Sequence, residues 1–100
     1  LLKDCQINNF IFSKKEDSLA VAYSKGNGVR RVNIYNANEG YIISKAINEE
    51  FNEAEYNIDE LGFNAEEFIF NVSKVNSTGN ADEKEGQYSF DIKSYEIKKL

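Results

Sequence analysis

The chain of 100 residues contains no histidine, proline, tryptophan or methionine, and its only cysteine is Cys5. Without histidine the chain lacks the side chain that most often acts as general base and metal ligand near neutral pH. A single cysteine allows neither an internal disulfide nor a cysteine-based metal cluster, which excludes the disulfide-dense class of small secreted domains. We therefore predict no catalytic residues, no metal site and no cofactor, and we expect that the protein is not an enzyme.

Long apolar runs and an excess of positive charge are absent as well. No stretch reaches the ~20 apolar residues of a membrane-spanning helix, so this segment is not expected to insert into a membrane. The net charge is −5, whereas binding to nucleic acid needs a basic surface, so nucleic acid is not an expected partner. The chain begins with Leu1 and has no methionine. We therefore expect a piece of a longer multidomain chain, whose neighbouring domains are its first partners.

The residues that are present suit one folded domain. Hydrophobic residues make up 41% of the chain and aromatic residues 13%, which is ordinary for globular proteins and above the range of disordered chains. One hundred residues suffice for a single hydrophobic core without a metal or a disulfide. We predict a single domain over residues 1–100.

Apolar and polar residues alternate in the manner of β-strands, and no segment keeps a helical period over three turns. Residues 25–28 and 36–40 are rich in Gly and Asn and predict turns, whereas the polar residues 48–55 predict a connection. The step from Ile7 to Phe10 breaks the alternation, which predicts a bulge. Strands are predicted at residues 7–12, 19–23, 32–35, 41–44, 56–61, 68–73 and 88–97, and in the last of these Tyr95 and Ile97 point to the opposite face from Tyr88, Phe90 and Ile92. This spacing predicts an all-β fold, a two-sheet antiparallel β-sandwich of about seven strands and of the immunoglobulin-like kind.

Residues 56–79, with the sequence YNIDELGFNAEEFIFNVSKVNSTG, narrow this prediction. A leucine precedes a turn, an aromatic residue opens the next strand, and a valine, an asparagine and a glycine follow at fixed distances. The residues are Leu61, Phe68, Val72, Asn76 and Gly79, and their spacing resembles the E–F region of fibronectin type III domains. The chain departs from the family pattern at Phe68, where a tyrosine is usual, and at Lys74, where a small residue is usual. We expect the turn before Phe68 to be held by packing, and Lys74 to lie near a sheet edge with its ammonium in water.

The resemblance also implies where an exposed contact surface lies. In type III domains the strands that correspond to residues 32–35 and 68–73 are neighbours in one sheet, and Tyr23 takes the position of a core aromatic. By alternation, Tyr35, Ile42 and Ile69 point away from the core residues of their strands. We predict that these three side chains form a partner-contact patch.

Acidic residues are concentrated in the middle of the chain. Between Ala46 and Ser73 there is no lysine or arginine and there are eight acids: Glu49, Glu50, Glu53, Glu55, Asp59, Glu60, Glu66 and Glu67. The remaining 72 residues hold nine acids and all twelve bases. The stretch favours a solvated face that keeps the domain soluble. The alternative is an acidic surface for a basic partner or a loosely held Ca²⁺.

Two functional hypotheses follow from these observations. The first is a non-catalytic spacer or protein-interaction module of a larger extracellular, cell-surface or phage-tail protein, as the type III resemblance implies. The alternative is a carbohydrate-binding β-sandwich module that accompanies a surface-acting enzyme. Sugar rings stack on exposed aromatic side chains, and Tyr35 and Tyr41 are the candidates for that role. Both hypotheses imply an extracellular or cell-surface location and a protein or glycan ligand.

Overall fold

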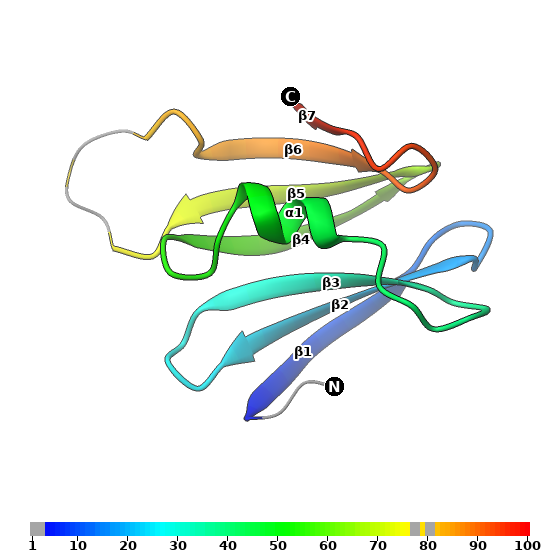
Figure 1. The fold of residues 1–100 in the computed structure, drawn as a ribbon, viewed down its shortest axis with the longest axis horizontal. Coiled ribbons are helices and arrows are strands. Elements are labelled where there is room, and N and C mark those ends of the chain that lie inside the picture. Colours follow the sequence, from blue (N-terminus) through cyan, green and yellow to red (C-terminus); the bar gives the residue numbers. More distant parts are fainter. Residues whose placement is uncertain (1–3, 77–78, 80–81) are drawn as a thin grey trace.

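The alternating pattern of the sequence is realised in the computed structural model, which describes residues 4–76, 79 and 82–100. The described residues form seven strands and one short helix (Figure 1). The strands are β1 (Cys5–Phe12), β2 (Ser18–Lys25), β3 (Arg30–Asn36), β4 (Tyr56–Asn64), β5 (Glu67–Lys74), β6 (Gly86–Asp91) and β7 (Ile97–Lys99). The helix, α1 (Lys45–Glu50), lies between β3 and β4 in the chain.

The strands form two antiparallel sheets, and each sheet keeps the order of the chain. One sheet has the order β1-β2-β3, and the other has the order β4-β5-β6-β7. Buried apolar side chains from both sheets pack against each other in one cluster. The predicted fold class, a two-sheet antiparallel β-sandwich, is confirmed.

The strand order differs from the one that the type III resemblance implies. β3 pairs with β2, whereas β5 pairs with β4 and β6. The expectation that residues 32–35 and 68–73 adjoin in one sheet is therefore wrong. Four residues, 26–29, join β2 to β3, and only Ala65 and Glu66 join β4 to β5. Connections this short hold consecutive strands side by side in one sheet, so the resemblance does not extend to the topology.

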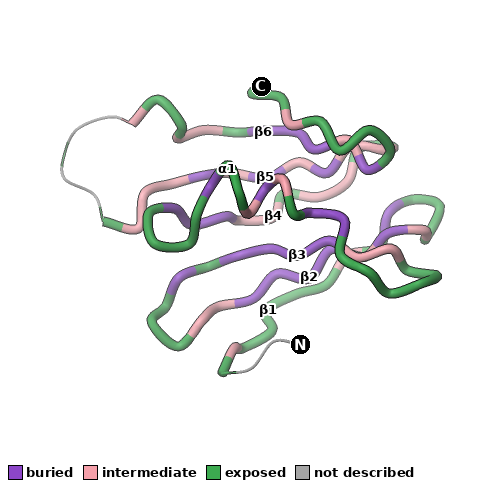
Figure 2. The backbone as a smooth tube through the Cα atoms, viewed as in Figure 1, coloured by how far each residue is buried: buried purple, intermediate pink, exposed green. Residues whose placement is uncertain are grey.

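The hydrophobic core lies between the two sheets. β2 and β3 contribute small or branched side chains such as Ala22 and Val32, and the four-stranded sheet contributes most of the aromatic ones. Phe68, Phe70 and Phe90 are fully buried. Figure 2 shows the consequence along the backbone, where β2 and β3 are largely buried and β1 is largely exposed.

Helix α1 takes the place of the first part of the polar connection predicted for residues 48–55. It is only six residues long, so its sequence is too short to display a helical period. Ile47 and Phe51, one helical turn apart, are fully buried, and the Phe51 ring centroid lies 4.8 Å from that of Tyr88. Burial of these two side chains holds α1 against the four-stranded sheet (Figure 1).

The strand predicted at residues 41–44 is reduced to a single bridge between Tyr35 and Ile42. Next to this bridge, the N–H of Ile43 donates to the carbonyl oxygen of Ile34, and the N–H of Ile34 donates to Ser44 Oγ. Because the side chain of Ser44 accepts the N–H of Ile34, backbone pairing stops there, and helix α1 begins at the next residue. The last predicted strand, residues 88–97, is instead divided by a turn into β6 and β7, so β7 is the seventh strand.

Two local predictions are confirmed, and a third is confirmed in part. The register of β1 against β2 shifts between Ile7 and Asn9, as the predicted bulge requires. At the turn between β4 and β5, the rings of Phe63 and Phe68 pack edge to face with centroids 5.2 Å apart, so packing holds this turn. Lys74 is the last residue of β5, and its side chain reaches the surface as predicted. However, β5 is an inner strand of its sheet, and the ammonium forms ion pairs with Glu55 and Asp82.

Candidate binding surfaces

The predicted contact patch is divided between the two sheets. Tyr35 and Ile42 are bridge partners, so their side chains lie on the same face. Ile69 lies on β5 in the other sheet, opposite Gly62 and Ser89. The prediction that all three share one patch is wrong, because it depends on the type III strand order.

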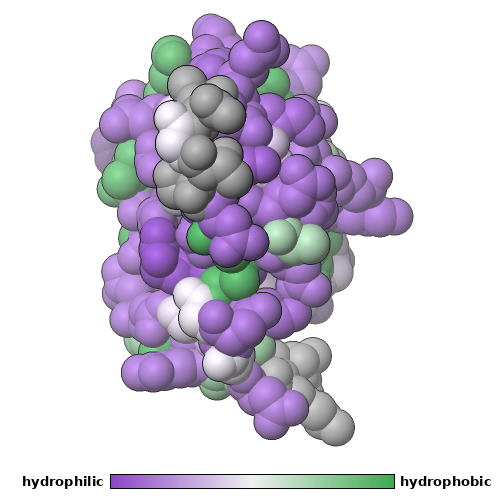
Figure 3. Space-filling view, turned by 90° about the vertical axis from the view of Figure 1, so that its left-hand side faces the viewer, coloured by the Kyte–Doolittle hydropathy of each residue, from purple (hydrophilic) through white to green (hydrophobic). Residues whose placement is uncertain are grey.

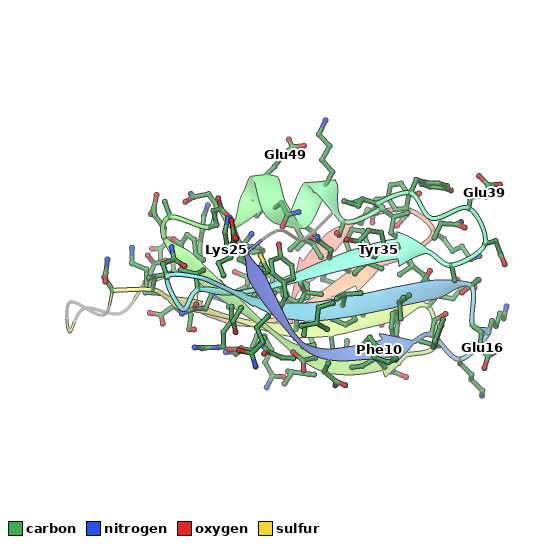
Figure 4. All side chains as sticks on the ribbon, turned by 90° about the horizontal axis from the view of Figure 1, so that it is seen from below. Phe10, Glu16, Lys25, Tyr35, Glu39 and Glu49 are labelled. Atoms are coloured by element: carbon green, nitrogen blue, oxygen red, sulfur yellow. The ribbon has the colours of Figure 1, made fainter. Side chains whose placement is uncertain are left out.

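Tyr35 and Ile42 belong to the outer face of the three-stranded sheet. The strand register places Ile42, Tyr35, Leu19 and Phe12 in one row across this face, and Val21 with Phe10 and Tyr23 with Ile7 in parallel rows. We call these eight residues the outer apolar face. Figure 4 views the sheet from the side of β1, with Phe10 and Tyr35 labelled. The face extends from the bridge at Ile42 to the edge strand β1.

The largest exposed part of the outer apolar face is on β1. Ile7, Phe10 and Phe12 are 57%, 63% and 49% exposed. Tyr23 is buried, but on this face and outside the central core cluster, so its predicted core position is wrong. Ala20 and Ala22 of β2 face the core instead and belong to the same cluster as its phenylalanine rings.

Polar atoms within the outer apolar face are hydrogen-bonded to one another. The hydroxyl of Tyr23 donates to Asn33 Oδ1 at 3.5 Å, and Asn33 Nδ2 donates to the hydroxyl of Tyr35 at 3.2 Å. Burial raises the pKa of Tyr23 above its ordinary value of 10.0, so its phenol stays uncharged further into the alkaline range. The face therefore presents apolar surface with its inner polar groups satisfied.

The strand β1 is also a free edge of its sheet. Its eight residues carry no charge, and among the described residues the backbone of 6–12 forms hydrogen bonds only to β2. The opposite outer edge, β7, is three residues long and includes Lys98 and Lys99. Short length and lysines are the usual protection of an edge against pairing with another chain. β7 has both. β1 has neither, and its regular edge is interrupted only by the bulge between Ile7 and Asn9.

The acidic residues of the middle of the chain are largely neutralised across the fold. Six of the eight form ion pairs with bases outside the stretch: Lys45–Glu49, Lys84–Glu50, Lys25–Glu53, Lys74–Glu55, Arg30–Asp59 and Lys15–Glu66. The hydrogen bond from Lys25 lowers the pKa of Glu53. Within the described part of the chain, no three His, Cys, Asp or Glu side chains are grouped to hold a metal. This arrangement favours a solvated face over a surface for a basic partner or Ca²⁺.

A polar cleft lies at the end of the sandwich where three turns meet. These turns are residues 13–17, residues 37–41 and the segment that joins β6 to β7, all at the right of Figure 1. The cleft has a volume of about 340 Å³ and is lined by Asp17, Ser18, Asn36, Asn38, Tyr41, Ile43, Ile92, Lys93 and Tyr95. Tyr41 and Tyr95 are 47% and 43% exposed. Sequence reasoning identified Tyr41 and missed Tyr95.

The other hollows and faces are less distinctive. A wider groove of about 1030 Å³ separates α1 from Tyr88, Tyr95 and Ile97. The acids on its rim, Glu49 and Glu50, are paired with lysines. At the opposite end of the molecule from the polar cleft, the visible surface is mostly hydrophilic (Figure 3).

Comparisons with known proteins identify no family. No family model, no curated protein and no solved structure matches the chain. Among the described residues, no helix is long and apolar enough to cross a membrane. The assignment of function therefore depends on the two surfaces, the β1 edge and the polar cleft.

Proposed function

We propose that the protein is a non-catalytic protein-interaction module that binds an extended segment of another protein by strand addition to β1. The observation that carries this proposal is the combination of a long, uncharged edge strand with exposed apolar side chains on one of its faces. A second strand that pairs with β1 would extend the three-stranded sheet by one strand.

The chemistry of the edge selects the kind of partner. Beyond the bulge, the outward N–H and C=O groups of residues 9–12 alternate regularly along the strand, and only an extended backbone offers matching groups at the same interval. Ile7, Phe10 and Phe12 lie on one face beside this edge, so alternate apolar side chains of the partner would pack against them. The partner is therefore an extended segment with apolar residues at every second position.

This role fits a module within a larger extracellular, cell-surface or phage-tail protein. The rest of the surface supports a spacer that avoids unwanted contacts. Six of the eight acids in the middle of the chain are paired with bases, and the other outer edge is short and includes two lysines. Neighbouring domains of the same polypeptide are one source of such a segment, and a separate protein is the other.

The test uses a random library of displayed heptapeptides selected against the immobilised chain. Selected peptides are synthesised, and their affinities are measured for the native chain and for Phe10→Lys, which places a charge beside the edge. Leu61→Lys is the matched control, because Leu61 is a similarly exposed apolar residue on the other sheet. We expect selected peptides to alternate apolar and polar residues, to perturb backbone amide NMR signals of β1, and to lose at least tenfold in affinity with Phe10→Lys only.

Two outcomes contradict the proposal. Selected peptides that perturb signals of the four-stranded sheet, or that bind Phe10→Lys as tightly as the native chain, place the binding surface elsewhere. Concentration-dependent sedimentation of the chain alone, abolished by Phe10→Lys, would make a second copy of this chain the occupant of the edge.

A further inference from the structure

Tyr95 has a backbone conformation that is unusual for a bulky residue. Its φ angle is +65°, in the left-handed region that is strained for a non-glycine residue and that occurs preferentially at functional sites. The turn is held by Asp91, whose carbonyl oxygen accepts the N–H of Tyr95 and whose carboxylate accepts those of Lys93 and Ser94. The ring stacks on buried Phe90, with centroids 6.0 Å apart and an interplanar angle of 9°. Tyr95 is thus a fixed, half-exposed aromatic ring.

Tyr41 is the second exposed aromatic ring of the same cleft. Its hydroxyl accepts a hydrogen bond from Asn36 Nδ2 at 3.3 Å. Asn36 in turn fixes the adjoining turn, because its Oδ1 accepts the N–H groups of Asn38 and Glu39. Ile42, the next residue after Tyr41 in the chain, forms the backbone bridge with Tyr35. Both rings are therefore ordered before any ligand arrives, which lowers the entropic cost of binding.

The polar groups between the two rings include donors and acceptors without an excess charge. Lys93 Nζ lies 3.4 Å from Asp17 Oδ2 in an ion pair, and the exposed amide of Asn38 supplies both donor and acceptor atoms. A second hydrogen bond, from the hydroxyl of Ser13, orients the Asp17 carboxylate. Glu16 and Glu39, labelled at this end in Figure 4, mark two of the turns around the cleft.

We propose that this cleft binds a neutral saccharide through a single sugar residue. A pyranose ring has a face of C–H groups that packs on an aromatic ring, and a rim of hydroxyls that both donate and accept hydrogen bonds. Tyr41 and Tyr95 provide the aromatic rings, and Asp17, Asn38 and Lys93 provide the hydrogen-bonding groups. The volume of about 340 Å³ lies at the small end of the range for ligand sites, which suits one ring. The paired Asp17 and Lys93 offer no unmatched charge for an anion.

The cleft also has room for a longer glycan to continue. An adjoining cleft of about 720 Å³ shares Asp17 and Ile92 with the first and is lined further by Ser13, Asn64 and Glu66. Both clefts lie at the loop end, away from the outer face of β1, so this proposal does not depend on strand addition. Of the two tyrosines suggested by the sequence for sugar stacking, Tyr41 lies in this cleft and Tyr35 lies on the outer apolar face.

The experiment titrates the full chain with methyl glycosides of glucose, galactose, mannose and N-acetylglucosamine, and with their linear oligomers, and follows backbone amide NMR signals. We expect saturable shifts at residues 36–41 and 91–96 with at least one of these sugars. Tyr95→Ala should weaken binding by about tenfold, because a stacking contact is lost, and Tyr95→Phe should retain it. Tyr35→Ala is the matched control and should bind as the native chain does.

A second variant separates binding from folding. Tyr95→Gly removes the ring and also relieves the positive φ, so it should remain folded and still lose sugar binding. The proposal is overturned if no sugar of the panel causes saturable shifts in the native chain. It is equally overturned if the shifts map to other residues, or if folded Tyr95→Gly binds as tightly as the native chain.

Discussion

The guanidinium of Arg31 donates a hydrogen bond of 2.6 Å from Nη2 to the carbonyl oxygen of Phe51, the residue that follows helix α1. The same side chain donates to the carbonyl oxygen of Tyr56 at 2.9 Å and to Asn48 Oδ1 at 3.1 Å. Arg31 is only 2% exposed, and burial lowers its pKa from the ordinary value. One buried cation on β3 therefore fixes both ends of the connection that leads into the four-stranded sheet.

Replacement of Arg31 by methionine should reduce the free energy of unfolding by about 2–4 kcal/mol, because three oxygen atoms lose a buried donor. Arg31→Lys should fall between the native chain and Arg31→Met, since an ammonium cannot reach all three oxygens in the geometry of the guanidinium. Urea denaturation measures both changes. Arg30→Met is the control: Arg30 pairs with Asp59 at the surface, and its loss should cost less than about 1 kcal/mol. Equal effects at the two positions would contradict the role assigned to Arg31.

Phe51→Ala should destabilise the fold by about 3–5 kcal/mol, the usual cost of removing a buried phenylalanine. Phe51 is fully buried, and its ring meets those of Tyr56, Phe70 and Tyr88. The control is Phe10→Ala on the exposed strand, which should change stability by no more than about 0.5 kcal/mol. Thermal and urea denaturation of the two variants compare the sites. A similar loss at both positions would mean that β1 contributes to the core.

The burial of side chains, such as that of Phe51 but not Phe10, is harder to predict from the sequence than the position of a strand. Alternation locates β2 correctly, but it does not reveal which face is buried. Larger side chains would ordinarily be assigned to the core, yet Ala20 and Ala22 occupy it and Val21 lies on the outer apolar face. The choice depends on the volume left by phenylalanines of the other sheet, which are distant in sequence.

The sequence does not predict helix α1, because the helix is short, and it does not predict the order of the strands in the sheets. Helix α1 is too short to show a period, and its position depends on burial of Ile47 and Phe51 against a sheet that follows it in the chain. The strand order follows from short turns, which the resemblance to a known family cannot supply. The alternation places Tyr95 in the last strand, whereas it lies in the turn between β6 and β7, where its φ angle and its stacking on Phe90 distinguish it.

The raised pKa of the Tyr56 phenol predicts a loss of stability at alkaline pH. Burial, with a further contribution from its hydrogen bond to Asp82, raises its pKa from 10.0 to about 12. The folded state therefore keeps the phenol proton after the unfolded chain has released it. The resulting contribution to stability is complete below pH 10 and disappears as the pH rises towards about 12.

Tyr56→Phe tests this prediction, because it keeps the ring between the ammonium groups of Lys74 and Lys84 and removes the hydroxyl. Urea denaturation across the alkaline range should show a steeper decline for the native chain than for Tyr56→Phe. Tyr41→Phe, at an exposed position, should decline as the native chain does. Parallel curves for the native chain and Tyr56→Phe would show that the phenol proton is not coupled to folding.

The lowered pKa of Asp91 predicts the opposite dependence, a loss of stability at acid pH. Hydrogen bonds from the backbone N–H groups of Ser94 and Lys93 lower its pKa below the ordinary value of 3.8. The unfolded chain then binds a proton before the folded chain does, so the stabilisation is present above pH 3.8 and is lost as the pH falls through the folded pKa. Asp91→Asn keeps an oxygen that can accept both N–H groups but does not titrate, and its stability should vary less with pH in this range.

Because these hydrogen bonds also hold the turn that carries Tyr95, Asp91→Asn links acid stability to the polar cleft. Backbone amide signals of residues 93–96 in the native chain should shift as the pH falls through the titration of Asp91, and the same signals in Asp91→Asn should not. Glu96→Gln changes an exposed side chain that takes no part in the hydrogen bonds of the Asp91 carboxylate, and it keeps the backbone carbonyl that accepts the N–H of Asp91. It should leave the native shifts in place. If the shifts persist in Asp91→Asn, the turn responds to another acid, and Asp17, whose pKa is also lowered and which lines the same cleft, becomes the group to replace.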